Sequence, residues 1–109
     1  MAMIYERDVF VSMRDEVSLC IDIFRPKGKN RVPALLAMSP YSKEIQSLPI
    51  PPQPYHSPVY NRGIEAGDPE YFVSNGYAHV IVDVRGIGKS GGQYRGWMSD
   101  QEATDGYDL

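Results

Sequence analysis

A short apolar run that ends in a glycine-rich turn constrains the fold more than any other stretch of this chain. Residues 78–92 read AHVIVDVRGIGKSGG. The β-branched residues at 80–82 are typical of a strand buried on both faces, and the glycines from Gly86 to Gly92 then turn the chain away. Because α/β folds place functional groups where such a strand ends, the sequence predicts an α/β fold with its functional edge here.

The turn matches two nucleotide-binding patterns, each of them incompletely. Gly86, Gly88 and Gly91 fit G-x-G-x-x-G, but that motif needs a helix opening directly from the glycines, and the residues after Gly91 make a poor helix start. Residues 88–90 resemble the end of a P-loop, but Asp83 stands where that motif requires its first glycine. A tight structural turn explains the glycines better.

One binding function stays open on the residues alone. A small α/β binding module could use the Gly86–Gly92 turn for a phosphate-bearing ligand. A helix that begins immediately after Gly91 would support this module, because its N-terminus would hold the phosphate. If the chain instead stays a loop as far as Trp97, the phosphate-binding module is not favoured.

Composition is that of an ordinary globular domain. The 109 residues suffice for one small domain, and 42% are hydrophobic and 23% charged. A net charge of −3 without a long basic run provides no electrostatic footprint for nucleic acid. No secretory leader opens the chain and no apolar run approaches membrane length. One cysteine, Cys20, is expected to be buried and unactivated, and it suits a reducing compartment. We therefore expect a cytoplasmic protein without nucleic-acid or membrane partners.

Four strands are indicated. Apolar and polar residues alternate over 9–13 and again over 18–24, which is the period of a half-buried strand. We expect these two strands to form an antiparallel hairpin at the edge of a sheet. The apolar runs 32–38 and 79–84 are expected to be buried, parallel strands that are adjacent or one strand position apart. The sheet is therefore predicted to be mixed.

Two helices have clear start signals. Asp68 is an N-cap acceptor followed by proline at the first helical position, and Asn75-Gly76 supplies a stop. This helix would be the crossover between the two parallel strands. Residues 99–102 read SDQE, a capping box, so a second helix is expected to begin near Asp100.

A proline-rich segment, 46–61, follows the third predicted strand. Its five prolines prevent a helix or a central strand. We favour a loop draped over a site rather than a linker, because Tyr55 and Tyr60 can pack against the protein. His56, a lone histidine in this loop, is expected to be solvated.

Five short motifs, in this order, resemble the cocaine-esterase / Xaa-Pro dipeptidyl-peptidase family of α/β-hydrolases, and together they span most of the chain. They are Met13-Arg14-Asp15, Ser39-Pro40-Tyr41-Ser42-Lys43, Asn75-Gly76-Tyr77-Ala78, Asp83-Val84-Arg85-Gly86-Ile87-Gly88-Lys89-Ser90 and Asp105-Gly106-Tyr107-Asp108. Each motif alone is weak, but the ordered set is specific.

The resemblance implies that residues 1–109 are the N-terminal portion of one α/β-hydrolase domain, with an antiparallel hairpin leading into parallel strands. It implies a serine hydrolase that cleaves esters or amides, as an acyl esterase or an Xaa-Pro dipeptidyl-peptidase, through an acyl-serine intermediate and without metal or cofactor. We do not take Ser90 as the nucleophile elbow. By the resemblance the nucleophile, acid and base lie beyond Leu109, and the substrate is a small ester, an amide or a peptide.

Tyr41 is the candidate catalytic residue. By the resemblance, the tyrosine of the Pro40-Tyr41 pair donates its hydroxyl to the oxyanion. The alternative is a tyrosine that packs under the proline-rich loop with its hydroxyl in water. For Asp83 and Arg85 we favour a structural role, as an ion pair or as a clamp on the backbone of the glycine turn, over a role in the site. Trp97 stays open between lining a pocket and capping the following helix.

The chain by itself is expected to be inactive and to self-associate into homo-oligomers. The strand 78–84 would lack a neighbour in this chain, and its edge would expose unpaired backbone groups. Such edges pair with other chains unless they are charged or covered.

Overall fold

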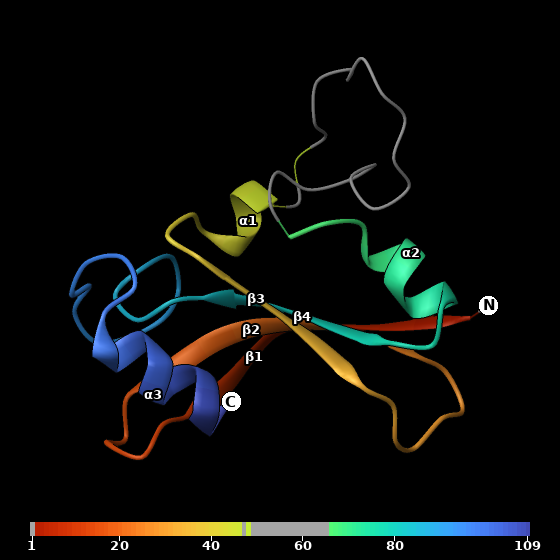
Figure 1. Cartoon of the computed structure of the whole chain (residues 1–109), viewed down its shortest axis with the longest axis horizontal. Coiled ribbons are helices and arrows are strands. Elements are labelled where there is room, and N and C mark those ends of the chain that lie inside the picture. The colour runs from red at the N-terminus through yellow and green to blue at the C-terminus, as the bar shows by residue number, and fades with distance from the viewer. Residues whose placement is uncertain (1, 47, 49–65) are drawn as a thin grey trace.

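The computed structural model describes residues 2–46, 48 and 66–109. The described residues form one sheet from β1 (Met3–Ser12), β2 (Ser18–Pro26), β3 (Ala34–Ser39) and β4 (Ala78–Asp83). The strand order is β1-β2-β4-β3 (Figure 1). The described helices are α1 (Lys43–Gln46), α2 (Pro69–Ser74) and α3 (Asp100–Asp108).

The predicted hairpin is confirmed, since β1 and β2 pair antiparallel with Val9 opposite Ile21. However, β1 starts at Met3 rather than near residue 9. The register shifts between Glu6 and Val9, so that two residues of β1 oppose one residue of β2. Such a bulge interrupts the alternation from which a strand is predicted, which explains the late predicted start.

The prediction that β2 is half-buried is wrong, because both of its faces are covered. Leu19 and Ile21 on one face and Cys20 and Asp22 on the other are all buried. Alternating polar residues indicated a solvated face, but here the polar face meets protein. Lys43 covers this face at Asp22, and Ser90 of the glycine turn covers it at Cys20.

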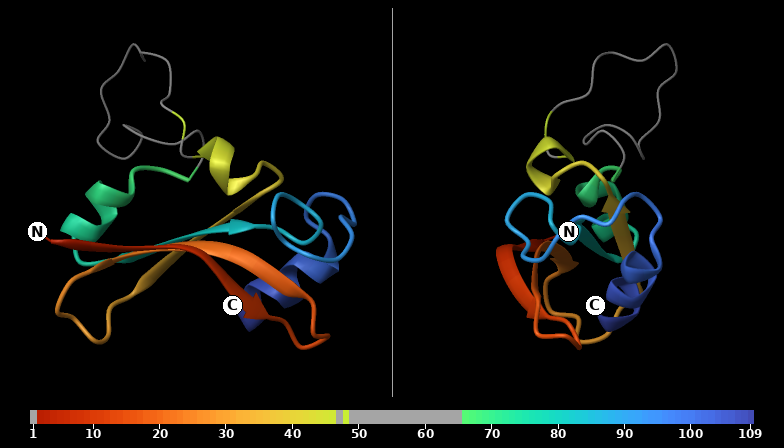
Figure 2. Two further views of the ribbon diagram at one scale, coloured as in Figure 1. Left: turned by 180° about the vertical axis from the view of Figure 1, so that it is seen from behind. Right: turned by 90° about the vertical axis from the view of Figure 1, so that its left-hand side faces the viewer.

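The two faces of the sheet carry different helices. On one face a core of Met13, Leu19, Ile21 and Val82 packs against Leu109, which follows α3. On the other face the Phe72 ring of α2 lies edge-on to His79 of β4, with ring centroids 4.9 Å apart. Figure 2 shows α1 and α2 on the side of the sheet opposite to α3. The arrangement is therefore three-layered, as α/β folds require.

The predicted parallel pair is confirmed, with β3 and β4 adjacent and Ser39 opposite Asp83. Two related expectations are wrong. First, β4 is not an edge strand, because β2 pairs with its other side. Second, β3 lies at one edge of the described sheet and is only partly buried, with Leu36 45% exposed. Within the described residues, the unpaired edge expected at 78–84 is therefore found on β3.

Both helix starts are where the local signals predicted them. The Asp68 carboxylate accepts a hydrogen bond from Glu70 N–H at 3.0 Å. The Ser99 hydroxyl accepts one from Glu102 N–H at 3.3 Å, while the Glu102 carboxylate accepts from Met98 N–H at 2.8 Å. The chain leaves α2 through Gly76, whose φ of +91° favours glycine.

Most of the proline-rich segment, including Tyr55, His56 and Tyr60, lies outside the described residues, so its predicted draping stays a prediction. The short helix α1, which ends at Gln46, was not predicted. Among the described helices, none has both the length and the apolar composition needed to cross a bilayer.

Candidate functional site

Tyr41 lies at the edge of the sheet where the parallel strands end. It follows β3 by two residues, and β3 ends opposite the last residue of β4, Asp83. The hydroxyl of Ser39 accepts a hydrogen bond from Tyr41 N–H at 3.2 Å and donates to Tyr41 C=O at 3.3 Å. The Tyr41 backbone is therefore held locally at the position where α/β sheets collect functional groups.

The Tyr41 side chain is open to solvent. It is 47% exposed, and its hydroxyl makes no hydrogen bond with the described residues. Restricted backbone and an available phenol are the features that a hydrogen-bond donor to a bound substrate needs.

Asp83 clamps the glycine turn through the backbone. One carboxylate oxygen accepts from Lys43 N–H at 2.7 Å and the other from Lys89 N–H at 3.0 Å. A Cβ added at Gly88 would overlap the Asp83 carboxylate, so glycine is required there. The predicted backbone clamp agrees with this geometry. The alternative of an Asp83–Arg85 ion pair does not, because Arg85 pairs with other carboxylates.

Ser90 lies in residues 88–92, GKSGG, which have the G-x-S-x-G spacing of a nucleophile elbow. Its hydroxyl donates to the Asp83 carbonyl and accepts from Cys20 N–H at 2.8 Å. No helix follows until Asp100, whereas an elbow is a strand-to-helix turn. Ser90 is therefore a structural link between the turn and β2, and not a free nucleophile.

The same stretch of loop bears on the phosphate-binding alternative. The chain runs without a helix from Val84 to Ser99, so no helix N-terminus stands after Gly91. The space in front of Gly88 is occupied by the carboxylate of Asp83, which would repel a phosphate. These observations favour the hydrolase over the phosphate-binding module.

Arg85 binds two carboxylates at once. Its Nε and Nη2 donate to the two oxygens of Asp105 at 2.9 and 2.7 Å. Its Nη1 and Nη2 donate to the two oxygens of Asp15 at 2.8 and 3.1 Å. These contacts raise the pKa of the Arg85 guanidinium, with hydrogen bonds to Asp105 and then Asp15 as the largest causes. One side chain thus joins the β4 turn, α3 and the hairpin turn.

A second arginine repeats this connection nearer the surface. Arg14 Nε and Nη2 donate to the two oxygens of Asp108, at distances down to 2.7 Å. Residues from three of the short motifs therefore meet in two sets of ion pairs, Arg14 with Asp108 and Arg85 with Asp15 and Asp105. Their side chains serve mainly to hold the framework around the sheet edge.

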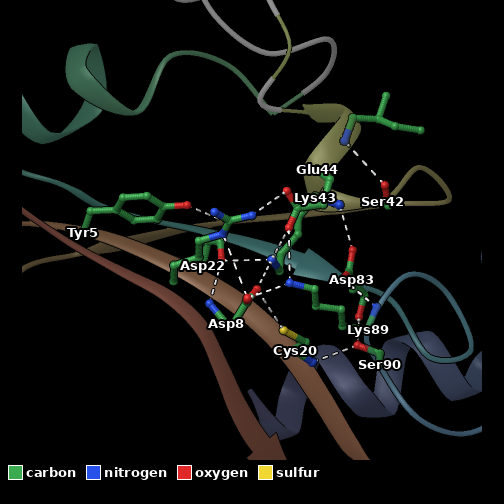
Figure 3. A network of polar contacts seen from close by, with 12 residues as sticks. Tyr5, Asp8, Cys20, Asp22, Ser42, Lys43, Glu44, Asp83, Lys89 and Ser90 are labelled. Carbon is green, nitrogen blue, oxygen red and sulfur yellow. Dashed lines mark hydrogen bonds and ion pairs between the residues drawn. The ribbon is translucent and has the colours of Figure 1, made fainter.

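The sequence reasoning missed a second network, which surrounds the buried ammonium of Lys43 (Figure 3). Lys43 contacts Asp8, Asp22 at 3.1 Å and Glu44 at 3.0 Å. Lys89 reaches Asp8 from the glycine turn at 2.7 Å. Lys43 lies in a motif that was recognised, but nothing in one sequence indicates that Asp8 and Asp22 face it.

Cys20 behaves as predicted. It is buried beside this network, and burial is the main cause that raises the pKa of its thiol to about 11. A thiol with such a pKa stays protonated at neutral pH and is a poor nucleophile. In the described part of the chain, no group of three or more His, Cys, Asp or Glu residues is arranged to hold a metal ion.

The family of the chain follows from its match to known proteins. The profile of the X-Pro dipeptidyl-peptidase (S15) family matches residues 15–109. The chain belongs to this family. The match includes the Tyr41 segment, the glycine turn and α3, and it confirms the resemblance seen in the motifs.

Individual S15 relatives are similar over most of this chain. A Mycobacterium bovis protein assigned as a serine esterase is 35% identical over 105 residues, which are 92% of this chain and 17% of that protein. The cocaine esterase of Rhodococcus sp. is 33% identical over 94 residues, 86% of this chain and 14% of that protein. The crystal structure of a CocE/NonD family hydrolase from Staphylococcus aureus matches 99% of this chain with a TM-score of 0.74 and 32% identity, covering 20% of that structure.

These matches confirm an α/β fold of the CocE/NonD hydrolase type and a relation to hydrolases and esterases. The chain spans less than a fifth of the length of the two curated relatives.

Proposed function

We propose that this chain is the N-terminal portion of one α/β-hydrolase domain in a serine hydrolase that cleaves ester or amide bonds through an acyl-serine intermediate. Support comes from membership of the S15 family and from relatives named as esterases. Because Ser90 is a structural link, the nucleophile, acid and base are expected in sequence beyond Leu109. Small esters, amides or peptides are the expected substrates, and the buried free thiol of Cys20 fits a reducing, cytoplasmic location.

The observation that carries the role of Tyr41 is an exposed phenol on a fixed backbone at the carboxyl edge of the parallel strands. Attack by a serine oxygen on a carbonyl carbon moves an electron pair onto the carbonyl oxygen. A donor already aimed at that oxygen stabilises the resulting oxyanion. Loss of one such donor costs about 10²–10³-fold in kcat.

The test is Tyr41→Phe in the protein extended to the length of its relatives, assayed with p-nitrophenyl acetate. We expect kcat to fall by about 10²-fold or more, with thermal stability unchanged because the exposed hydroxyl makes no bond with the described residues. Tyr77→Phe is the matched control, since Tyr77 precedes β4 at the opposite edge of the sheet.

If Tyr41→Phe leaves kcat within about threefold of the parent, which is far below the loss of a donor, the oxyanion role is wrong. The 109-residue chain alone should show no turnover above a matched inactive protein. Turnover by this chain would instead place a nucleophile among the residues present.

A further inference from the structure

The three N–H donors of the Lys43 ammonium are all engaged within the protein. Its side chain is fully buried, and an ammonium has three N–H donors. Three carboxylates surround it, those of Asp8, Asp22 and Glu44. With each donor facing a carboxylate, Lys43 cannot also bind a substrate or act as a base.

The charges around Lys43 make the cluster a strong tether. Burial alone would lower the pKa of the Lys43 ammonium. Hydrogen bonds to Asp8, Glu44 and Asp22 together raise the pKa by more than burial lowers it, so Lys43 stays charged. Lys89 and Arg7 add two more cations, at 2.7 Å from Asp8 and 3.0 Å from Glu44. Three cations thus meet three carboxylates, and the buried charge is compensated.

The tether holds the segment that carries Tyr41. Two residues after Tyr41, Lys43 fixes its side chain to the hairpin and its N–H to Asp83 at 2.7 Å. At the far end of α1, Gln46 Nε2 donates to the Ser39 hydroxyl at 2.9 Å, and that hydroxyl holds the Tyr41 backbone. Residues 39–46 therefore form a closed loop, and Lys43 is the buried side chain through which this loop contacts the sheet.

We propose that Lys43 is a positioning residue, which fixes the Tyr41 hydroxyl by tying residues 39–46 to the carboxylates of Asp8 and Asp22. The inference rests on the proposed function, because it acts through Tyr41 as oxyanion donor. A displacement of about 1 Å in a catalytic group costs on the order of 10²-fold in rate, so even a modest loosening of this loop has a kinetic effect.

The bulge in β1 gives independent support. Asp8 has φ of +56°, in the left-handed region that non-glycine residues rarely adopt. This conformation presents its carboxylate to both Lys43 and Lys89, and it is reinforced by Asp8 N–H donating to Asp22 Oδ1 at 2.9 Å. Strain of this kind persists where the surroundings enforce it, and it clusters at functional sites. The left-handed conformation of Asp8 therefore serves to place its carboxylate beside Lys43.

The experiment is a double-mutant cycle in the protein extended to the length of its relatives, with p-nitrophenyl acetate as substrate. We expect Lys43→Met to lower kcat by about 10–100-fold with KM within about threefold. In the Tyr41→Phe background the same substitution should change kcat by less than about threefold, because a donor that is absent cannot be misplaced. Arg25→Met, which removes a cation paired with Glu6 across the hairpin at 2.9 Å, is the matched control.

A second variant covers the outcome in which Lys43→Met does not fold. Asp8→Asn keeps the size and one acceptor of the side chain but removes its charge. It should lower kcat by about 3–10-fold, again with little effect in the Tyr41→Phe background.

The outcomes separate the two proposals. If Tyr41→Phe itself has no effect, the oxyanion role fails and the positioning role with it. If Tyr41→Phe lowers kcat but Lys43→Met multiplies that loss in full, Lys43 does not act through Tyr41 and only the positioning role is overturned. A Lys43→Met enzyme with kcat within about threefold of the parent, well short of a misplaced donor, overturns it as well.

Discussion

Among single residues, His79 combines deep burial with an unfilled hydrogen-bonding position. It is 1% exposed, and its Nδ1 has no hydrogen-bond partner among the described residues. Burial lowers the pKa of this imidazole below its ordinary value, while the Ala66 backbone and the Asp68 charge oppose that effect only in part. The folded chain therefore favours neutral His79.

The sign of the pH dependence follows. Below the ordinary histidine pKa of 6.5, the unfolded chain binds a proton that the folded chain resists, so unfolding is favoured as the pH falls. We expect the melting temperature to decrease between pH 8 and pH 5.5, and to decrease less in His79→Phe. His56 and every carboxylate are present in both proteins, so the comparison isolates the contribution of His79. Equal decreases in the two proteins would contradict the prediction.

At the scale of elements, α3 is attached to the rest of the chain through two arginines whose surroundings differ. The Arg85–Asp105 pair is buried, with Asp105 1% exposed, whereas the Arg14–Asp108 pair is largely open to water on its arginine side. Loss of one partner of a buried pair leaves an uncompensated charge in the interior, while an exposed pair is screened.

We therefore expect Arg85→Met to destabilise the chain by about 3–5 kcal/mol, and Arg14→Met by at most about 1 kcal/mol. Urea unfolding of the two variants measures the difference. Hydrogen exchange should show a larger loss of protection in residues 100–108 for Arg85→Met than for Arg14→Met. Similar losses of stability in both variants would mean that burial does not govern how α3 is held.

Local signals account for what could be predicted about these elements. The caps at Asp68 and Ser99 depend on neighbours within three residues, so the sequence shows them directly. The partners of Arg85 lie 20 and 70 residues away, and no local pattern identifies them. The same separation hid the cluster at Lys43, and it made the polar face of β2 look solvated.

For the whole molecule, the exposed edge of β3 determines how the chain associates with other chains. β3 pairs only with β4 in the described sheet, and Leu36 is 45% exposed on it. An uncharged strand edge of this kind pairs readily with another chain.

We expect the 109-residue chain to self-associate through this edge, and Leu36→Lys to return it to a monomer by placing a charge on β3. Light scattering at matched concentrations measures the mass. Leu48→Lys is the matched control, because Leu48 is 54% exposed but lies outside the sheet. A monomeric parent chain, or equal effects of both lysines, would show that the β3 edge is not the contact.

The strand order also determines when the sheet can be completed during synthesis. β4 pairs with β2 on one side and with β3 on the other, yet β4 is synthesised after both of them. At about 5–20 residues per second, β4 emerges roughly 2–8 s after β3. Until then the nascent chain holds a finished hairpin and a separate strand, each with an open edge. Slower synthesis between residues 40 and 77 would lengthen the time during which both edges are available to other chains.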